Sequence, residues 1–168
     1  MRGLLLLGLL LAAPRAQGQY YESHREVSLL GGLGLGYSDV IRSKRGATGV
    51  AGVLELGGSL TVGDDRNEVF LLTRGVLGPS GSEGVLLGGY RSFFGDEDWQ
   101  SFVDLGASLR LFSGTWVGPR LGFGARHTLS DHLSLYGGFG LSLGFGSGLR
   151  WDAEAFTGLQ WHFPISSR

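Results

Sequence analysis

The sequence predicts an all-β fold, an eight-stranded antiparallel up-and-down β-barrel that spans a membrane, and three observations support it. Apolar residues take every second position in several segments, most regularly from 133 to 145, where Ser, Gly and one Tyr fill the places between. Glycine is enriched, with 32 residues in 168, and many glycines share the less apolar face. Lys44 is the single lysine, whereas solvated strand faces usually carry Lys and Glu. One face is therefore expected to meet lipid and the other to fill a narrow interior.

Residues 1–18 are expected to be a secretory signal peptide, and residues 19–168 the barrel domain. Arg2 precedes an apolar run from Leu4 to Leu11, and small residues follow the run. The run is shorter than the roughly 20 apolar residues of a membrane-spanning helix. Without Arg2 and Arg15, 12 basic residues remain against 15 acidic ones, so the formal charge changes from −1 to −3 and a nucleic-acid partner is not expected. The absence of cysteine excludes disulfides and a lipoprotein anchor.

Period-two alternation divides the rest of the chain into eight segments, and an even number lets an up-and-down sheet close without exposed edges. The expected strands are 27–37, 48–62, 68–77, 84–92, 102–112, 116–128, 133–145 and 150–163. The third and fourth are less regular, because Phe70 and Leu72 share a face with Arg74. Each of the last four has about 10 to 13 residues, enough to cross a membrane at a tilt.

The connections between these segments suggest an orientation. Tight polar turns at 63–67, 95–98 and 130–131 fall on the periplasmic side if the N-terminus is periplasmic. The connections 39–47, 78–83, 113–115 and 147–148 then face outward. The first of them is the longest and carries Arg42, Lys44 and Arg45, so it is the candidate extracellular loop for surface interactions.

Charged side chains are expected to point into the barrel. The predicted network contains Glu55, Arg74, Asp104, Arg110, Arg120, Arg126, Arg150, Asp152 and Glu154, with His162 near the periplasmic mouth. Buried charges cost several kcal/mol each unless they are paired, so salt bridges are required. Asp104 and Arg126 are expected to pair, whereas Arg110 and Arg120 lie near each other and need Glu154, Asp152 or water. A packed polar plug is favoured over an ion or proton path, because eight strands leave little internal room.

Two further features concern the outer wall. Pro119 cannot donate a ladder hydrogen bond, so a bulge near the outer rim is expected around it. Aromatic residues near the expected strand ends predict two girdles at the headgroup levels of the membrane. The proposed girdle residues are Tyr37, Phe112, Trp116, Phe145 and Trp151 at the outer end, and Phe93, Phe94, Trp99, Trp161 and Phe163 at the inner end.

A family resemblance rests on the hairpin from Gly122 to Tyr136, in which one alternating strand runs through LSDHLSL into the next. This hairpin, the leader and the alternating segments resemble the small eight-stranded outer-membrane barrels of Gram-negative bacteria, the group of the OmpA transmembrane domain, OmpX and the opacity proteins. The resemblance implies an exported, outer-membrane protein. It also implies outer-membrane lipid, lipopolysaccharide and the outer-membrane assembly machinery as partners, and a monomer.

Catalysis would need a serine nucleophile within hydrogen-bond reach of a histidine base. The sequence offers His132 with Ser134, His127 with Ser130, and Ser23 with His24. A polar turn explains the first two pairs better than a lipid-modifying site does. The four histidines show no metal-ligand spacing, and no cofactor is expected.

The sequence therefore predicts a non-enzymatic integral membrane barrel with a structural or surface-interaction role. One alternative is a soluble, secreted, lipocalin-like barrel whose apolar face turns inward around an apolar ligand. A lipid-modifying outer-membrane enzyme is a further, minor alternative. The outward or inward direction of the apolar face separates the first two interpretations.

Overall fold

A computed structural model describes residues 26–41, 48–63, 67–79, 81–96, 98–112 and 114–165. The expected signal peptide, the Ser23 and His24 pair and the basic residues Arg42, Lys44 and Arg45 lie outside the described residues. Within the described residues, no helix is long and apolar enough to cross a membrane.

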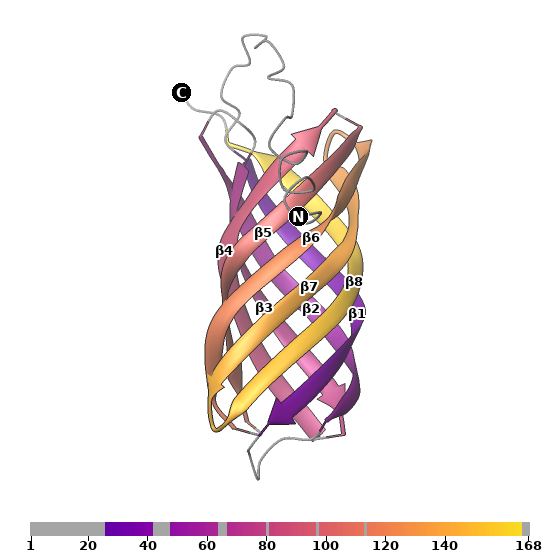
Figure 1. The fold of residues 1–168 in the computed structure, drawn as a ribbon. Helices are drawn as coiled ribbons and strands as arrows, with labels where there is room; N and C mark the ends of the chain where they lie inside the picture. The colour runs from indigo at the N-terminus through magenta and orange to yellow at the C-terminus, as the bar shows by residue number, and fades with distance from the viewer. Residues whose placement is uncertain are drawn as a thin grey trace, which may run out of the picture.

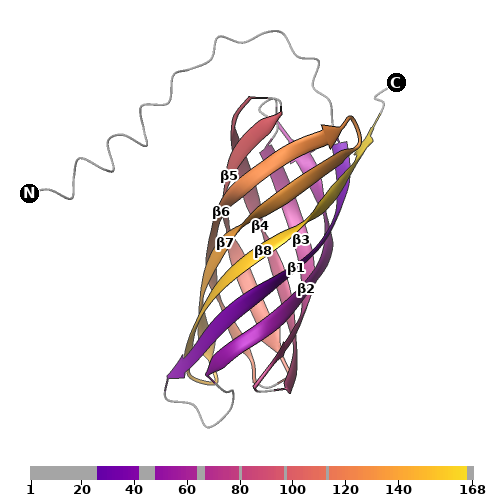
Figure 2. The ribbon, with the colours of Figure 1, turned by 90° about the vertical axis from the view of Figure 1, so that its right-hand side faces the viewer.

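Eight antiparallel strands follow one another around a closed barrel, in chain order (Figures 1 and 2). The strands are β1 (Glu26–Ile41), β2 (Gly49–Val62), β3 (Asn67–Gly78), β4 (Gly81–Gly95), β5 (Trp99–Leu111), β6 (Trp116–Ser130), β7 (Leu133–Gly146) and β8 (Leu149–Pro164). Each overlaps one segment predicted from the alternation, so the predicted fold class is confirmed. The observed strands are longer at many ends, most of all in β4, where pairing continues through Glu83 and Phe94.

Closure depends on the pairing of the first strand with the last. β1 pairs with β8 from Glu26 opposite Pro164 to Ile41 opposite Leu149, so neither strand is left as a free edge. A membrane interior offers no water to unpaired backbone groups, and a closed sheet satisfies them internally. β1 begins and β8 ends at one end of the barrel, which we call the terminal end (Figure 1). The opposite end, where β7 turns into β8, is the loop end.

The apolar face of the alternation points outward. Leu35, Leu54 and Leu105 are 60% or more exposed, and similar leucines, valines and phenylalanines cover the outer wall on every strand. Leu30 and Leu87, by contrast, are at most 1% exposed and lie inside. Since the larger apolar set faces away from the interior, the soluble lipocalin-like alternative is not supported. Strand β3 keeps the period, with Phe70, Leu72 and Arg74 all on the inner face.

Glycines give the interior its remaining space. Tyr136 on β7 reaches along the inner wall past β8 and β1 and donates to Glu55 Oε1 on β2 at 2.8 Å. Its ring passes over Gly158 on β8 and Gly32 on β1, where a Cβ would lie 2.6 Å and 2.9 Å from the Tyr136 hydroxyl oxygen. Any larger side chain at these two positions would displace the tyrosine that links β7 to β2.

Two expectations about the wall are wrong in part. Pro119 is exposed on the outer face and pairs in register with Ala107, without the expected bulge; the register shift in β6 lies between Thr128 and Ser130. Trp116 and Phe93 do not belong to the girdles. Trp116 is 2% exposed inside the barrel, and Phe93 packs against the core. Each lies an even number of residues from an arginine that points inward on the same strand, Arg120 on β6 and Arg91 on β4, so it faces the same way. The other eight aromatic residues are exposed on the wall.

We predict that Gly158→Val lowers the free energy of unfolding by about 1–3 kcal/mol, because overpacking forces Tyr136 and the β1 backbone to move. Urea unfolding of the refolded barrel in phospholipid vesicles measures this change. The matched control is Gly75→Val, where a Cβ meets nothing within 4 Å on the outer wall. Valine favours strands, so the control should be neutral or slightly stabilising. Equal losses in both variants would contradict the account.

Candidate functional site

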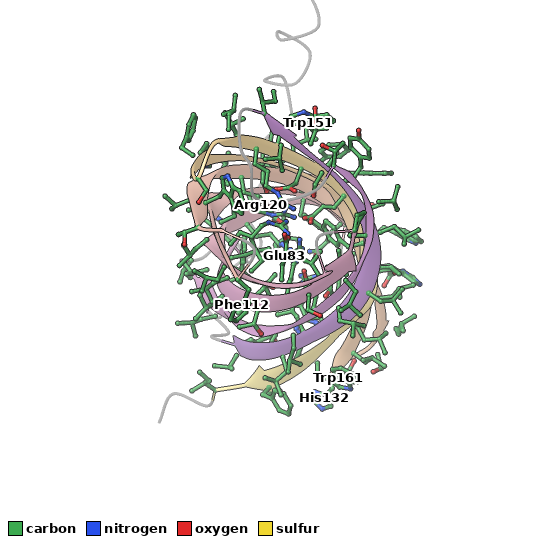
Figure 3. All side chains as sticks on the ribbon, turned by 90° about the horizontal axis from the view of Figure 1, so that it is seen from below. Glu83, Phe112, Arg120, His132, Trp151 and Trp161 are labelled. Atoms are coloured by element: carbon green, nitrogen blue, oxygen red, sulfur yellow. The ribbon has the colours of Figure 1, made fainter. Side chains whose placement is uncertain are left out.

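The barrel interior holds a charge-balanced set of buried side chains, viewed down the barrel axis in Figure 3, where Glu83 and Arg120 lie inside the ring of strands. The structure places all nine residues of the predicted network there and adds Arg91, Glu68 and Glu83, which are 1%, 3% and 3% exposed. Among the residues that the structure describes, the interior set is then six arginines and six carboxylates: Arg74, Arg91, Arg110, Arg120, Arg126 and Arg150 with Glu55, Glu68, Glu83, Asp104, Asp152 and Glu154. The charges cancel.

Nearest the loop end, Glu83 on β4 binds two arginines. It accepts from Arg110 Nη1 at 2.5 Å and from Arg150 Nη2 at 3.1 Å. Asp152 accepts from Arg150 Nε at 2.9 Å and lies 3.4 Å from Arg110 Nη2. Ser38 completes the cluster by donating to Asp152 and accepting from Arg150. Two cations and two anions from three strands, β4, β5 and β8, therefore neutralise one another at this level.

The next level is built around Glu154 on β8. Arg74 and Arg120 both form ion pairs with its carboxylate. Arg74 also donates through Nε to Glu55 Oε2 at 2.5 Å, and Glu55 is the acceptor for Tyr136. Of the partners left open for Arg110 and Arg120, Glu154 pairs with Arg120, and Asp152 lies beside Arg110, which is held more closely by Glu83.

Arg91 occupies the middle of the barrel, where it pairs with Asp104 through Nε at 2.7 Å and Nη2 at 3.0 Å. Its guanidinium carbon lies 4.2 Å from the Phe102 ring centre, with Phe70 and Tyr136 also within cation–π distance. Its Nη1 is buried and has no hydrogen-bond partner among the described residues. Such a fork and ring geometry suits arginine and not lysine.

The expected pairing of Asp104 with Arg126 is wrong. Asp104 lies opposite Gly122, and Arg126 lies opposite Gln100, four residues along the ladder. The short connection between β5 and β6 sets this register, since Arg110 already pairs with Trp116. Asp104 therefore turns to Arg91 on the other neighbouring strand.

Arg126 has its own cluster nearer the terminal end. It donates to Glu68 Oε1 at 2.8 Å and to Gln100 Oε1 at 2.5 Å. Gln160, which is fully buried, donates to the same Glu68 at 3.0 Å. The Phe93 ring centre lies 3.9 Å from the arginine, so this charge too is covered by an aromatic face.

His162 lies at the terminal mouth between two serines. Its Nε2 is 2.9 Å from Ser134 Oγ, its Nδ1 is 3.1 Å from Ser28 Oγ, and Glu26 Oε2 lies 3.5 Å from Nδ1. His132, the expected partner of Ser134, is exposed in the turn before β7. Ser134 is 1% exposed and lies on β7, which pairs with β6 on one side and β8 on the other.

The other predicted serine and histidine pair is also not assembled. His127 stacks on Trp99 with the ring centres 4.5 Å apart, and its Nδ1 lies 2.9 Å from the Asp98 carbonyl oxygen. These contacts hold it on the outer surface at the terminal end. Among the described residues, no group of histidine and acidic side chains has the arrangement of a metal site.

The two charge clusters nearest the loop end leave little space between them. A cavity of about 10 Å³ remains between the two clusters nearest the loop end, bordered by Arg74, Arg110, Arg120 and Trp116. That volume accommodates a single water molecule at most. A buried network of charged side chains fills this part of the interior.

Arg91, Glu68 and Glu83 were missed because the registers of β3 and β4 were uncertain from sequence. Strict parity would have found them. Glu68 precedes Phe70, Leu72 and Arg74 at two-residue steps, and Glu83 and Arg91 flank Val85 and Leu87 in the same way. The two-residue period is harder to read in these two strands, because apolar and charged residues share their inner face.

Comparisons with known proteins support the fold. No family model and no curated protein matches the chain. Among solved structures, Neisserial surface protein A is similar, with 9% identity, a TM-score of 0.60 and coverage of 83% of this chain and 97% of that one. The N-terminal β-barrel domain of Pseudomonas aeruginosa OprF is 15% identical, with a TM-score of 0.58 and coverage of 88% of this chain and 100% of that one. Ail, the attachment invasion locus protein of Yersinia pestis, is 10% identical, with a TM-score of 0.56 and coverage of 84% of this chain and 100% of that one. The chain has the fold of the small eight-stranded outer-membrane β-barrels.

We predict that Asp104→Asn destabilises the barrel by about 3–5 kcal/mol, because it leaves the fully buried Arg91 without its anion. Equilibrium unfolding in vesicles measures the loss. Replacing both partners, with Arg91→Met and Asp104→Leu together, should restore most of it, since well-packed apolar groups can substitute for a buried pair. Asp131→Asn, in an exposed turn, is the control. A loss in Asp104→Asn no larger than in this control is the contradicting result.

Proposed function

We propose that this chain is a non-enzymatic integral outer-membrane protein with a structural or surface-interaction role. The observation that carries the proposal is the division of the barrel into an apolar outer wall and a charge-balanced, filled interior. A wall of this kind is stable only against lipid, and a filled interior leaves no internal site for a substrate. The crowding of Ser134 and the exposure of His132 favour a non-enzymatic role over a lipid-modifying one.

The proposed orientation places the terminal end in the periplasm and the loop end outside the cell. Outer-membrane lipid and lipopolysaccharide are then the partners of the wall, the outer-membrane assembly machinery inserts the barrel, and the barrel is a monomer. Arg42, Lys44 and Arg45 in the longest connection give the outer surface its basic residues. A surface role is also consistent with two of the structural neighbours, Neisserial surface protein A and the attachment invasion locus protein Ail.

Expression with its leader in a Gram-negative host tests this function. We expect the protein in the outer-membrane fraction, with a gel band that shifts on boiling because a closed barrel resists detergent until heated. Arg91→Met with Asp104→Leu, which keeps the interior packed, serves as a variant that should retain the shift. A product found wholly in the soluble periplasmic fraction would contradict the proposal.

The filled interior also predicts that the barrel does not conduct ions. Reconstituted in a planar lipid bilayer, the folded barrel should give no discrete conductance steps, because Trp116, Tyr136 and the arginine clusters occupy the cross-section. A general porin reconstituted in the same way is the positive control. Regular steps that scale with the amount of inserted barrel would show an ion path and overturn the plug interpretation.

A further inference from the structure

A groove runs along the outer wall over β8. In the half of β8 nearest the loop end, Trp151, Ala153 and Ala155 occupy alternate positions, which face outward. After the large Trp151, the two alanines leave the outer surface of this strand low. Their ladder partners on both sides are large. Ala153 lies between Leu141 on β7 and Tyr37 on β1, and Ala155 lies between Phe139 and Leu35.

This alternation of small and large residues creates an apolar trench. Residues one strand further out extend both walls. On one side Phe123 on β6 packs against Phe139, with the ring centres 5.6 Å apart, and on the other side Val50 on β2 pairs with Tyr37. The groove has a volume of about 460 Å³. Its lining side chains on the outer face are all apolar apart from the Tyr37 hydroxyl, so nothing in it recognises a polar ligand.

The loop end of the groove is closed by an aromatic and polar cap. Tyr37 and Trp151 lie with ring centres 5.5 Å apart. The Trp151 indole nitrogen donates to Asp39 Oδ2 at 3.2 Å, and Thr48 Oγ1 donates to Asp39 Oδ1 at 2.9 Å. Aromatic rings with such polar contacts mark the headgroup level of a membrane. The groove therefore descends from the headgroup level into the hydrocarbon.

We propose that this groove holds one acyl chain of a lipid from the leaflet that meets the loop end, an inference that rests on the proposed membrane location. The groove is continuous with the lipid-facing wall, so acyl chains are the molecules that reach it. The walls stand on β7 and β1, two strand spacings or about 10 Å apart, which leaves room for one hydrocarbon chain between their side chains. A second barrel would present a broad convex wall that bridges the trench without entering it.

Native mass spectrometry tests the proposal on the mature barrel, folded in detergent with added lipid A, the acylated part of lipopolysaccharide. We expect one lipid to remain bound per barrel over a range of lipid concentrations. Ala155→Phe fills the floor of the groove and should weaken this binding about tenfold, because the loss of contact with two or so methylenes is sufficient for that change. Ala153→Leu, a smaller obstruction, should weaken it in the same direction. Ala107→Phe is the matched control, an outward alanine on β5 outside the groove.

The outcomes separate the inference from the function on which it rests. Each sample is first checked for the heat-dependent gel shift of a closed barrel in membranes. With the shift present, equal lipid binding in wild type, Ala155→Phe and Ala107→Phe refutes the groove. A mass of two protein copies that is present in wild type and absent in Ala155→Phe would instead identify a second copy as the occupant of the groove, and would also refute the proposal. A wild-type protein without the shift would refute the proposed function itself.

Discussion

The pairing of buried arginines with buried carboxylates is the interaction on which the rest of this barrel depends. Eight strands enclose a space that side chains must fill, and here much of that space is filled by charge. An unpaired ion in such surroundings costs several kcal/mol, so each cation needs its anion at hydrogen-bond distance. Glu83, Glu154, Asp104 and Glu68 meet this need at successive levels along the axis, each with at least one arginine.

The network also explains the composition. All six interior cations are arginines, whose planar forks bind two acceptors at once and stack on rings, as Arg91 does between Asp104 and Phe102. The glycines of the inner face leave the volume that these long side chains and Tyr136 occupy. With polarity gathered inside, the outer wall carries leucine, valine and aromatic residues and scarcely any charge.

Most of the architecture could be predicted from the sequence, because a period of two assigns a face to every residue of a strand. The strand count and the inward direction of Arg74, Arg120 and Glu154 follow from parity alone. The pairing of Asp104 with Arg91 could not be predicted in the same way, because it depends on how far two strands slide past each other. That shift is set by the few residues of the β5–β6 connection. Trp116 shows a related limit, since its place near a strand end suggested a girdle while its parity turned it inward.

The central claim, that lipid meets one face of each strand and a packed polar network fills the other, is tested most directly by nuclear magnetic resonance of leucine methyl groups in bicelles. A nitroxide on a lipid acyl chain should broaden the signals of Leu35, Leu54 and Leu105 and leave those of Leu30, Leu72 and Leu87 sharp, because the first three are exposed and the last three buried. A water-soluble gadolinium chelate should broaden neither set strongly. Broadening of the inner leucines by the lipid label, or of the outer ones by the chelate, would contradict this account.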